Sequence, residues 1–161
     1  MTAPLPLAVV DIDGVVADVR HRLHHVESRP KDWPAFFAAA AADPPLAEGV
    51  ARVQELLADH DVVYLTGRPD HLRRVTTDWL AAHGIPGSRL VMRRRGDFRP
   101  ARVTKAEELR RLARDRTVAV VIDDDPEVCA ALREAGWPVE QATWVPHAKT
   151  LREAQEREGR T

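Results

Sequence analysis

Two carboxylates stand directly after a short apolar run, where residues 7–10 (Leu-Ala-Val-Val) lead into Asp11, Ile12, Asp13 and Gly14. Side chains of a strand alternate between its faces, so Asp11 and Asp13 project to one side while Ile12 turns into the core. Two carboxylates this close repel each other unless a cation or a shared proton compensates. The pattern therefore predicts a divalent metal site or an acid/base pair at a strand end, the alternative being a polar turn.

A second apolar run, residues 62–65, stops at Thr66, Gly67, Arg68 and Pro69. A hydroxyl, a free glycine N–H and a guanidinium follow one another here, and such groups can hold a phosphate. We expect a helix begun by Pro69 to add the positive end of its dipole. An ordinary turn between a strand and a helix is the alternative.

A third apolar run, residues 118–122, ends in Asp123, Asp124 and Asp125, followed by Pro126. Consecutive acids at the end of a buried strand are costly without a cation. The alternative is a helix N-terminus whose acids suit the helix dipole. Between the second and third runs, Lys105 stands at the start of a helix predicted over residues 104–114, where a lone lysine would be solvated.

Short strands alternate with helical patterns along the whole chain, which indicates an α/β fold, a Rossmann-like three-layer sandwich with a mostly parallel sheet and helices on both faces. The predicted strands are residues 7–12, 62–65, 90–92, 118–122 and a fifth from 139. The predicted helices are residues 32–42, 46–60, 70–83, 104–114 and 126–135. Ligands bind beyond the carboxyl ends of such strands, where Asp11, Thr66 and Asp123 all lie.

Composition excludes several classes of protein. The chain has 161 residues and a formal net charge of −1, which argues against wholesale coating of nucleic acid. Six arginines within residues 89–102 leave open a local track for a phosphate backbone. Cys129 is the single cysteine, so we expect no internal disulfide and a buried thiol. The N-terminus lacks a signal-peptide pattern, and we expect a cytoplasmic protein without a membrane span.

Four motifs in this order, DIDGVVAD (11–18), LTGRP (65–69), Lys105 and VVIDDDP (120–126), resemble those of the haloacid dehalogenase (HAD) superfamily of phosphotransferases. Within it, residues 92–105, residues 123–128 and Arg22 resemble the 3′-phosphatase domain of polynucleotide kinase/phosphatases. The resemblance covers residues 7–139. It implies a HAD-like phosphatase domain over residues 1–146 with a minimal cap or none. Residues 147–161 would form a charged helical tail, attached only loosely.

The resemblance also implies a magnesium-dependent phosphomonoester hydrolase that forms an aspartyl-phosphate. Asp11 would be the nucleophile, and Asp13 the general acid and then the general base. The implied catalytic residues are Asp11, Asp13, Thr66 and Lys105. The implied substrate-binding residues are Gly67, Arg22 and Arg68. The implied Mg²⁺ ligands are Asp11, the Asp13 carbonyl, and Asp123 or Asp124.

Several alternatives stay open at this point. The substrate is either the 3′-phosphate end of a nucleic acid or a small phosphomonoester, because Ala101 stands where the related phosphatase domains carry an acid. A phosphate-binding module without turnover is a third reading of the same residues. His21, His24 and His25 are solvated, face the substrate or bind zinc, and the aromatic residues 33–37 pack a helix or stack on a base. No protein partner is indicated.

Overall fold

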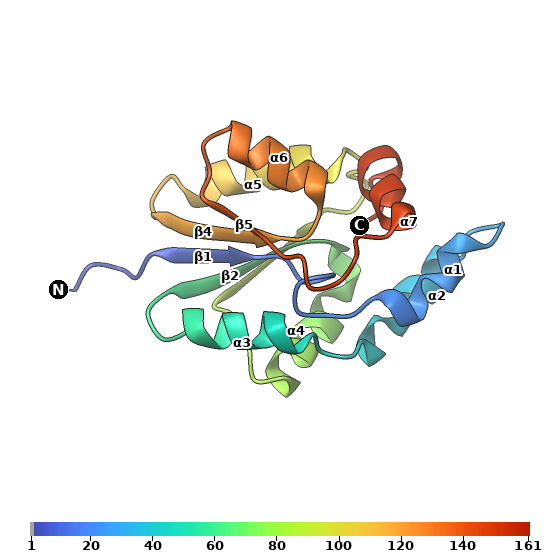
Figure 1. Cartoon of the computed structure of the whole chain (residues 1–161), viewed down its shortest axis with the longest axis horizontal. Coiled ribbons are helices and arrows are strands. Elements are labelled where there is room, and N and C mark those ends of the chain that lie inside the picture. The colour runs from blue at the N-terminus through green and yellow to red at the C-terminus, as the bar shows by residue number, and fades with distance from the viewer. Residues whose placement is uncertain (1) are drawn as a thin grey trace.

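The computed structural model describes residues 2–161 and contains one five-stranded sheet (Figure 1). The strands are β1 (Leu7–Val10), β2 (Asp61–Pro69), β3 (Arg89–Arg93), β4 (Val118–Asp123) and β5 (Val139–Gln141). All neighbours pair in parallel, in the order β3-β2-β1-β4-β5. Val9 of β1 stands between Val63 of β2 and Val121 of β4. The predicted parallel α/β sheet is confirmed, and its carboxyl ends meet at one edge.

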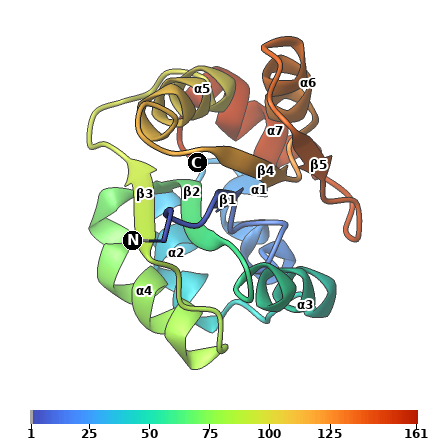
Figure 2. The ribbon, with the colours of Figure 1, turned by 90° about the vertical axis from the view of Figure 1, so that its left-hand side faces the viewer.

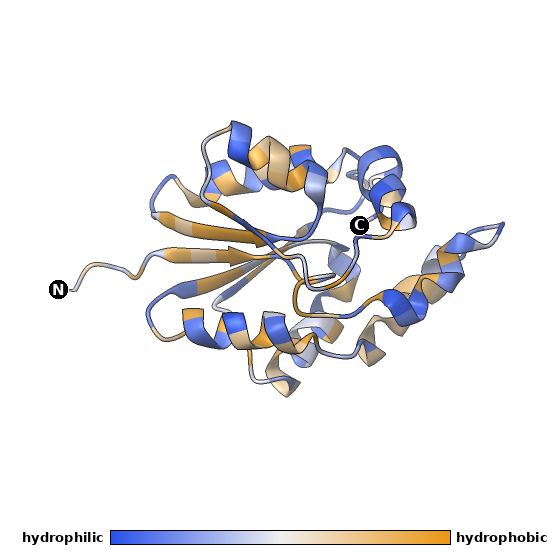
Figure 3. Ribbon diagram, viewed as in Figure 1, coloured by the Kyte–Doolittle hydropathy of each residue, from blue (hydrophilic) through white to orange (hydrophobic). Residues whose placement is uncertain are grey.

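Helices cover both faces of the sheet, so the predicted three layers are confirmed (Figure 2). One layer holds α3 (Ala47–Leu56) and α4 (Arg73–Ala82), and the other holds α5 (Ala101–Leu112) and α6 (Pro126–Glu134). Alternation along β1 sends Ala8 and Val10 into the core with α3 and α4, and Leu7 and Val9 into the core with α5 and α6. The apolar strands inside polar-faced helices are visible in Figure 3.

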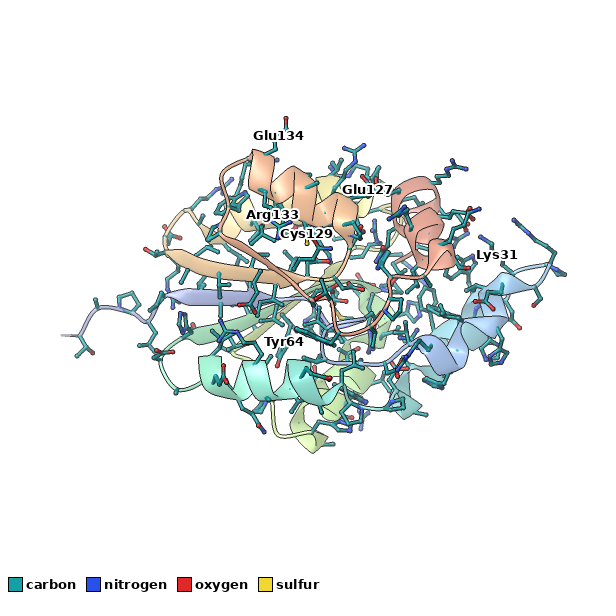
Figure 4. All side chains as sticks on the ribbon, in the orientation of Figure 1. Lys31, Tyr64, Glu127, Cys129, Arg133 and Glu134 are labelled. Atoms are coloured by element: carbon teal, nitrogen blue, oxygen red, sulfur yellow. The ribbon has the colours of Figure 1, made fainter. Side chains whose placement is uncertain are left out.

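Figure 4 labels one buried residue on each side of the sheet, Tyr64 and Cys129. Tyr64 of β2 is fully buried on the α3 side, where its hydroxyl donates to the Ile85 carbonyl at 2.6 Å. Cys129 of α6 is fully buried on the other side of the sheet, as the sequence predicts. Burial raises the pKa of this thiol to about 12, which leaves it unreactive at neutral pH.

A small helical arm, residues 20–42, follows β1 and extends past the carboxyl edge of the sheet (Figure 1). It consists of η1 (Arg20–Arg22), α1 (His24–Glu27), α2 (Trp33–Ala38) and η2 (Ala39–Ala42). Phe36 and Phe37 are buried in a third apolar cluster, together with Leu72 and Met92, so both pack the arm onto the rest of the domain. In the described part of the chain no larger insertion covers the sheet, and the prediction of a minimal cap is confirmed.

The second motif differs from its predicted form. Strand β2 does not end at Leu65: after an irregularity it pairs once more, Pro69 with Arg93 of β3. Pro69 is extended, with φ −66° and ψ 148°. A 3₁₀ turn, η3 (Asp70–Leu72), then precedes α4, which begins at Arg73. The expected helix start at Pro69 is therefore wrong, because pairing with β3 keeps Pro69 in the sheet.

The C-terminal segment, residues 147–161, is helical in α7 (Lys149–Glu153) and in the π-helical turn η4 (Ala154–Glu158). The expectation of a loose attachment is wrong, since Leu151, Ala154, Gln155 and Thr161 are buried. Lys31 of the arm pairs with Glu158, and other contacts reach α5. This segment closes the carboxyl edge beside the arm. None of the helices in residues 2–161 is long and apolar enough to cross a membrane.

Candidate active site

The carboxyl ends of β1, β2 and β4 bring the predicted motifs together. Lys105 on α5 reaches across to them, and its Nζ lies 3.1 Å from Asp11 Oδ2 and donates to Asp123 Oδ2 at 2.6 Å. All three side chains are less than 5% exposed. The ammonium is thus held by two acids from adjacent strands, and the lysine is not a solvated residue.

Asp11, Asp123 and Asp124 form an acid cluster in which one carboxylate oxygen from each lies within 4.8 Å of the others. Gly14, with φ +77°, makes this approach possible. A Cβ at Gly14 would stand 2.0 Å from Asp124 Oδ2, so any larger residue would push the Asp124 carboxylate away. Within residues 2–161 the acid cluster is the one group of His, Cys, Asp or Glu with metal-site geometry.

The charges of the acid cluster do not balance. Three carboxylates face a single ammonium, that of Lys105, and Asp124 Oδ1 is buried without a hydrogen-bond partner. Burial and the neighbouring acids raise the pKa of Asp11 well above its usual range, and burial raises the pKa of Asp124 to about 6. An all-oxygen donor set with two surplus negative charges and a free oxygen fits a hard dication such as Mg²⁺.

Asp125 has a different place. It is the N-cap of α6, and its Oδ1 accepts from the Glu127 N–H at 2.9 Å. The acid that decorates a helix N-terminus is therefore Asp125, whereas Asp123 and Asp124 turn toward Asp11. The sequence leaves open a cation site or a helix N-terminus for these three acids. Asp123 and Asp124 fit the first, and Asp125 fits the second.

Asp13 belongs to a second group, the arginine–aspartate network of Asp13, Asp43, Arg22 and Arg68. Its Oδ1 accepts from Arg68 at 2.6 and 2.9 Å and from Arg22 at 3.2 Å. Asp43 accepts from the same guanidiniums at 2.7 to 2.9 Å. Burial opposes the charged form of Asp13, but Arg68 and Arg22 outweigh it and lower the pKa of Asp13. Two acids and two guanidiniums balance here without a metal.

The side chains of Arg22 and Arg68 are 1% exposed, so neither reaches the surface in this structure. Arg22 also lies over the Phe36 ring, 4.3 Å from its centroid, and Arg68 donates to Thr76 Oγ1 at 3.2 Å. Among residues 2–161, Asp13 Oδ2 accepts no hydrogen bond. The network thus fixes one oxygen of Asp13 and leaves the other without a hydrogen-bond partner.

Three residues of the site carry no signal in the sequence: Asp43, His147 and Gln155. Asp43 follows an alanine run and precedes prolines, as in an ordinary helix stop. His147 Nδ1 lies 3.0 Å from Asp124 Oδ2. The Gln155 amide nitrogen, oriented toward acceptors, donates to His147 Nε2 at 3.0 Å and to Asp125 Oδ2 at 2.9 Å. The imidazole proton therefore sits on Nδ1 and points at Asp124.

Thr66 and Gly67 lie on the other side of β1. The Arg68 N–H donates to Thr66 Oγ1 at 3.2 Å, which leaves the Thr66 hydroxyl proton free to donate. A narrow cleft of about 40 Å³ leads to Thr66 and Lys105, with Arg93, Arg94 and Arg99 in its walls. This cleft is an approach to the site from the side of β3 and α5.

Most arginines of residues 89–102 already have partners. Arg99 pairs with Asp97 and Glu107 at 2.8 Å each, and Arg102 pairs with Glu156 at 3.0 Å. Arg93 donates to backbone carbonyls, including those of Asp97 and Arg99. The histidines do not form a zinc site in the described residues: His21 contacts Asp43 at 2.6 Å, and the rings of His24 and His25 lie against each other.

Solved structures with a similar fold include a protein of the haloacid dehalogenase-like family. The hydrolase SP0104 from Streptococcus pneumoniae, of the haloacid dehalogenase-like family, is 13% identical, with a TM-score of 0.60 and coverage of 95% of this chain and 92% of that one. A putative β-phosphoglucomutase from Thermotoga maritima is 14% identical, with a TM-score of 0.57 and coverage of 97% and 95%. The fold is therefore HAD-like, as the motifs predict.

The family model of the polynucleotide kinase PNKP phosphatase domain matches residues 6–144, and the chain belongs to this family. Chains in two structures of the Pnkp1/Rnl/Hen1 complex, described in one as an RNA repair complex, are 24% identical to it, with TM-scores of 0.69 and 0.71. They match 85% and 89% of this chain. The chain spans less than half of theirs, 42% and 47%. No curated protein matches it significantly in sequence.

Proposed function

We propose that this domain is a Mg²⁺-dependent phosphomonoester hydrolase that acts through an aspartyl-phosphate on the 3′-phosphate end of a nucleic acid. The observation that carries the proposal is the uncompensated acid cluster around Asp11, beside an independently balanced Asp13, in a chain of the PNKP phosphatase family. A phosphate-binding module without turnover would need neither a second positioned carboxylate nor its free oxygen.

Asp11 is the nucleophile in this proposal. Its Oδ1 accepts the Ile12 N–H at 2.8 Å and its Oδ2 faces Lys105, which fix the carboxylate at the end of β1. A carboxylate oxygen forms a bond to phosphorus while the ester oxygen leaves with its electron pair. Water then attacks the acyl phosphate, inorganic phosphate leaves, and the Asp11 carboxylate is restored.

Asp13 moves the protons. It gives a proton to the leaving ester oxygen, and in the second step it takes a proton from the attacking water. The two arginines hold Asp13 charged in the free protein, in the form that suits the second step. An arriving phosphate adds negative charge beside Asp13 and favours its protonated form, which the first step requires.

The remaining groups hold the transferred phosphoryl group. Thr66 and the Gly67 N–H would bind its oxygens, and Lys105 would offset the charge of Asp11 and the phosphate. Mg²⁺ held by Asp11, the Asp13 carbonyl and Asp123 or Asp124 would let the anionic nucleophile approach the anionic phosphate. Asp124, with its free oxygen, has the better geometry as a direct ligand, since Asp123 is engaged by Lys105 and the Asp125 N–H.

The substrate class rests on the small arm and on the family. Without a large cap, the cleft at Thr66 and Lys105 opens directly to the surface, where a macromolecular end can approach. A substrate-binding role for Arg22 and Arg68 would require a guanidinium to exchange Asp13 for the phosphate, because both are fully engaged. We propose instead that they position Asp13.

The test compares turnover of four substrates with Mg²⁺ and with chelator: a 3′-phosphorylated oligonucleotide, a 5′-phosphorylated one, free nucleotides and para-nitrophenyl phosphate. We expect metal-dependent hydrolysis with the highest kcat/KM on the 3′-phosphorylated oligonucleotide. Better turnover of a free nucleotide would assign a small-molecule phosphatase. Metal-independent turnover, or none on any substrate, would overturn the proposal.

A further inference from the structure

A second hollow lies next to the cleft and is built from aromatic rings and arginines. Its volume is about 160 Å³. The lining includes the rings of Phe37, His71 and Phe98 and the side chains of Arg94, Arg95 and Arg160. A hollow that combines flat apolar rings with guanidiniums suits a flat, electron-rich ligand close to negative charge. We call it the aromatic pocket.

Phe98 is the clearest anomaly of this pocket. Its side chain belongs to a residue that is 57% exposed, although a large apolar ring is normally covered. The guanidinium of Arg160 lies 5.1 Å from the centre of the Phe98 ring. Also in the lining, the rings of Phe37 and His71 meet edge to face, with their centroids 5.8 Å apart. Flat surfaces thus line the hollow from the β3–α5 loop, the arm and η3.

The backbone around Phe98 is shaped to keep this wall in place. Gly159, with φ +57°, lies against it so closely that a Cβ there would stand 2.0 Å from the Phe98 carbonyl oxygen. Arg93 holds the same loop by donating to the carbonyls of Asp97 and Arg99 at 3.1 and 2.8 Å. The ring is therefore exposed on a loop that is tied down on both sides, which is how a preformed binding surface is built.

The aromatic pocket adjoins the cleft of the active site. Both hollows share Arg93, Arg94 and Asp97 in their walls. The cleft reaches Thr66 and Lys105, and the pocket reaches Pro69, two residues after the Gly67 N–H of the proposed phosphate site. This shared wall is the observation that lets one ligand place a phosphate at Thr66 and a flat group in the aromatic pocket.

We propose that the aromatic pocket binds the nucleobase of the nucleotide that carries the phosphate. This inference rests on the proposed function and names the part of the substrate that the second site takes. Phe98 and Arg160 offer surfaces for stacking, which accepts every base because every base has a π face. Arg95 is exposed and forms no ion pair within residues 2–161, so its charge is free for the next phosphate. The pocket favours nucleotide ends over other phosphomonoesters without reading their sequence.

The decisive experiment pairs two substrates with two variants. The substrates are a 3′-phosphorylated oligonucleotide and the same oligonucleotide with an abasic 3′-terminal residue. The variants are Phe98→Ala and, as a control, Leu5→Ala, which removes another exposed side chain, 51% exposed, in the N-terminal residues. Because stacking on the ring strengthens binding of any base, we expect Phe98→Ala to lower the preference for the base about tenfold, and Leu5→Ala to leave it unchanged.

Equal losses of kcat/KM on the two substrates in Phe98→Ala would overturn the proposal. The ring would then support the conformation of its loop and make no contact with the base. A direct reading of stacking uses 2-aminopurine as the 3′-terminal base, bound to the Asp11→Asn variant so that no turnover occurs. Its fluorescence should be quenched on binding, and less so when Phe98→Ala is added. Quenching without any wild-type turnover would overturn the proposed activity and support base binding in the aromatic pocket. Turnover without quenching would support the proposed activity and overturn base binding in the aromatic pocket.

Discussion

Asp11 and Asp13 are two residues apart directly after β1, yet their surroundings are electrostatic opposites. Asp11 lies among acids with one lysine, and its pKa is raised; Asp13 lies among arginines, and its pKa is lowered. The acid cluster is left with surplus negative charge and a free oxygen on Asp124, whereas the arginine–aspartate network is neutral. The acid cluster is therefore consistent with a metal site, whereas the charges of the arginine–aspartate network balance within the protein.

The difference comes from the neighbours of β1. Asp11 faces β4 and α5, which supply Asp123, Asp124 and Lys105. Asp13 faces β2, which supplies Arg68, and the arm, which supplies Arg22 and is followed directly by Asp43. In the proposed mechanism, the neighbouring elements thus assign one aspartate to covalent attack and the other to proton transfer, a known way to separate the roles of paired acids.

The largest effect is expected at Asp11. Asp11→Asn should lower kcat on the 3′-phosphorylated oligonucleotide by at least about 10³-fold, because an amide does not accept a phosphoryl group. Asp13→Asn should cost about 10²-fold to 10⁴-fold through lost proton transfer. Single-turnover kinetics measure both, with thermal unfolding as the control for folding. Wild-type turnover in Asp11→Asn would exclude the covalent mechanism and with it the contrast between the two acids.

The balanced side is tested by removing one of its cations. Arg68→Met should lower the free energy of unfolding by about 3–5 kcal/mol, because it leaves buried carboxylates without a partner. Arg74→Met is the matched control, since the Arg74 side chain is 96% exposed, and we expect less than about 0.5 kcal/mol there. Urea unfolding at neutral pH measures both. Equal small losses of unfolding free energy in the two variants would mean that Arg68 does not balance the charges of the buried network.

Arg22→Met tests by kinetics whether Arg22 positions Asp13 or contacts the substrate. If Arg22 positions Asp13, the variant loses the same factor in kcat on para-nitrophenyl phosphate and on the oligonucleotide. A much larger loss on the oligonucleotide would show that this arginine contacts the remote part of the substrate, the role that the family resemblance implies.

The surplus charge of the acid cluster predicts that removing one of its carboxylates stabilises the metal-free protein. The pKa of Asp124 is about 6 in the folded protein and near 3.8 when unfolded, so its favourable contribution is present below about pH 4 and is lost as the pH rises through 6. In chelator at pH 7.5, Asp124→Asn should therefore be more stable than the wild type, on the order of 1–3 kcal/mol. The difference should vanish near pH 4. A wild type that is the more stable protein in chelator at pH 7.5 would contradict the surplus charge.

The smallest effect concerns the support of Asp124 by His147. Asparagine can place an amide N–H where the imidazole Nδ1 stands, and leucine cannot. His147→Leu should weaken Mg²⁺ binding about tenfold, while His147→Asn stays near the wild type, as for other residues that orient metal ligands. Calorimetric titration with Mg²⁺ measures this without turnover. Equal affinities in the two variants would limit His147 to a packing role.

The sequence predicts what is local and misses what is distant. Asp11, Thr66 and Asp123 could be placed at strand ends because apolar runs stop there, and parallel strands bring such ends together. Asp43 and His147 could not be found, because each contacts residues that are 21 or more positions away, with no periodic pattern. Arg22 was singled out, but its partners were not. Pro69 was misplaced because its pairing depends on β3.

The packing of Thr161 against Gly67 bears on how the protein should be handled. Thr161 is 4% exposed, and its carbonyl carbon would stand 2.1 Å from a Cβ at Gly67. Any residues joined to Thr161, including an affinity tag, would have to leave from beside the Gly67 peptide and the Arg93 guanidinium that donates to Thr161. Residues 2–5 are exposed at the opposite end of the sheet (Figure 1). A fusion or surface linkage made there leaves the phosphate side of the domain unobstructed.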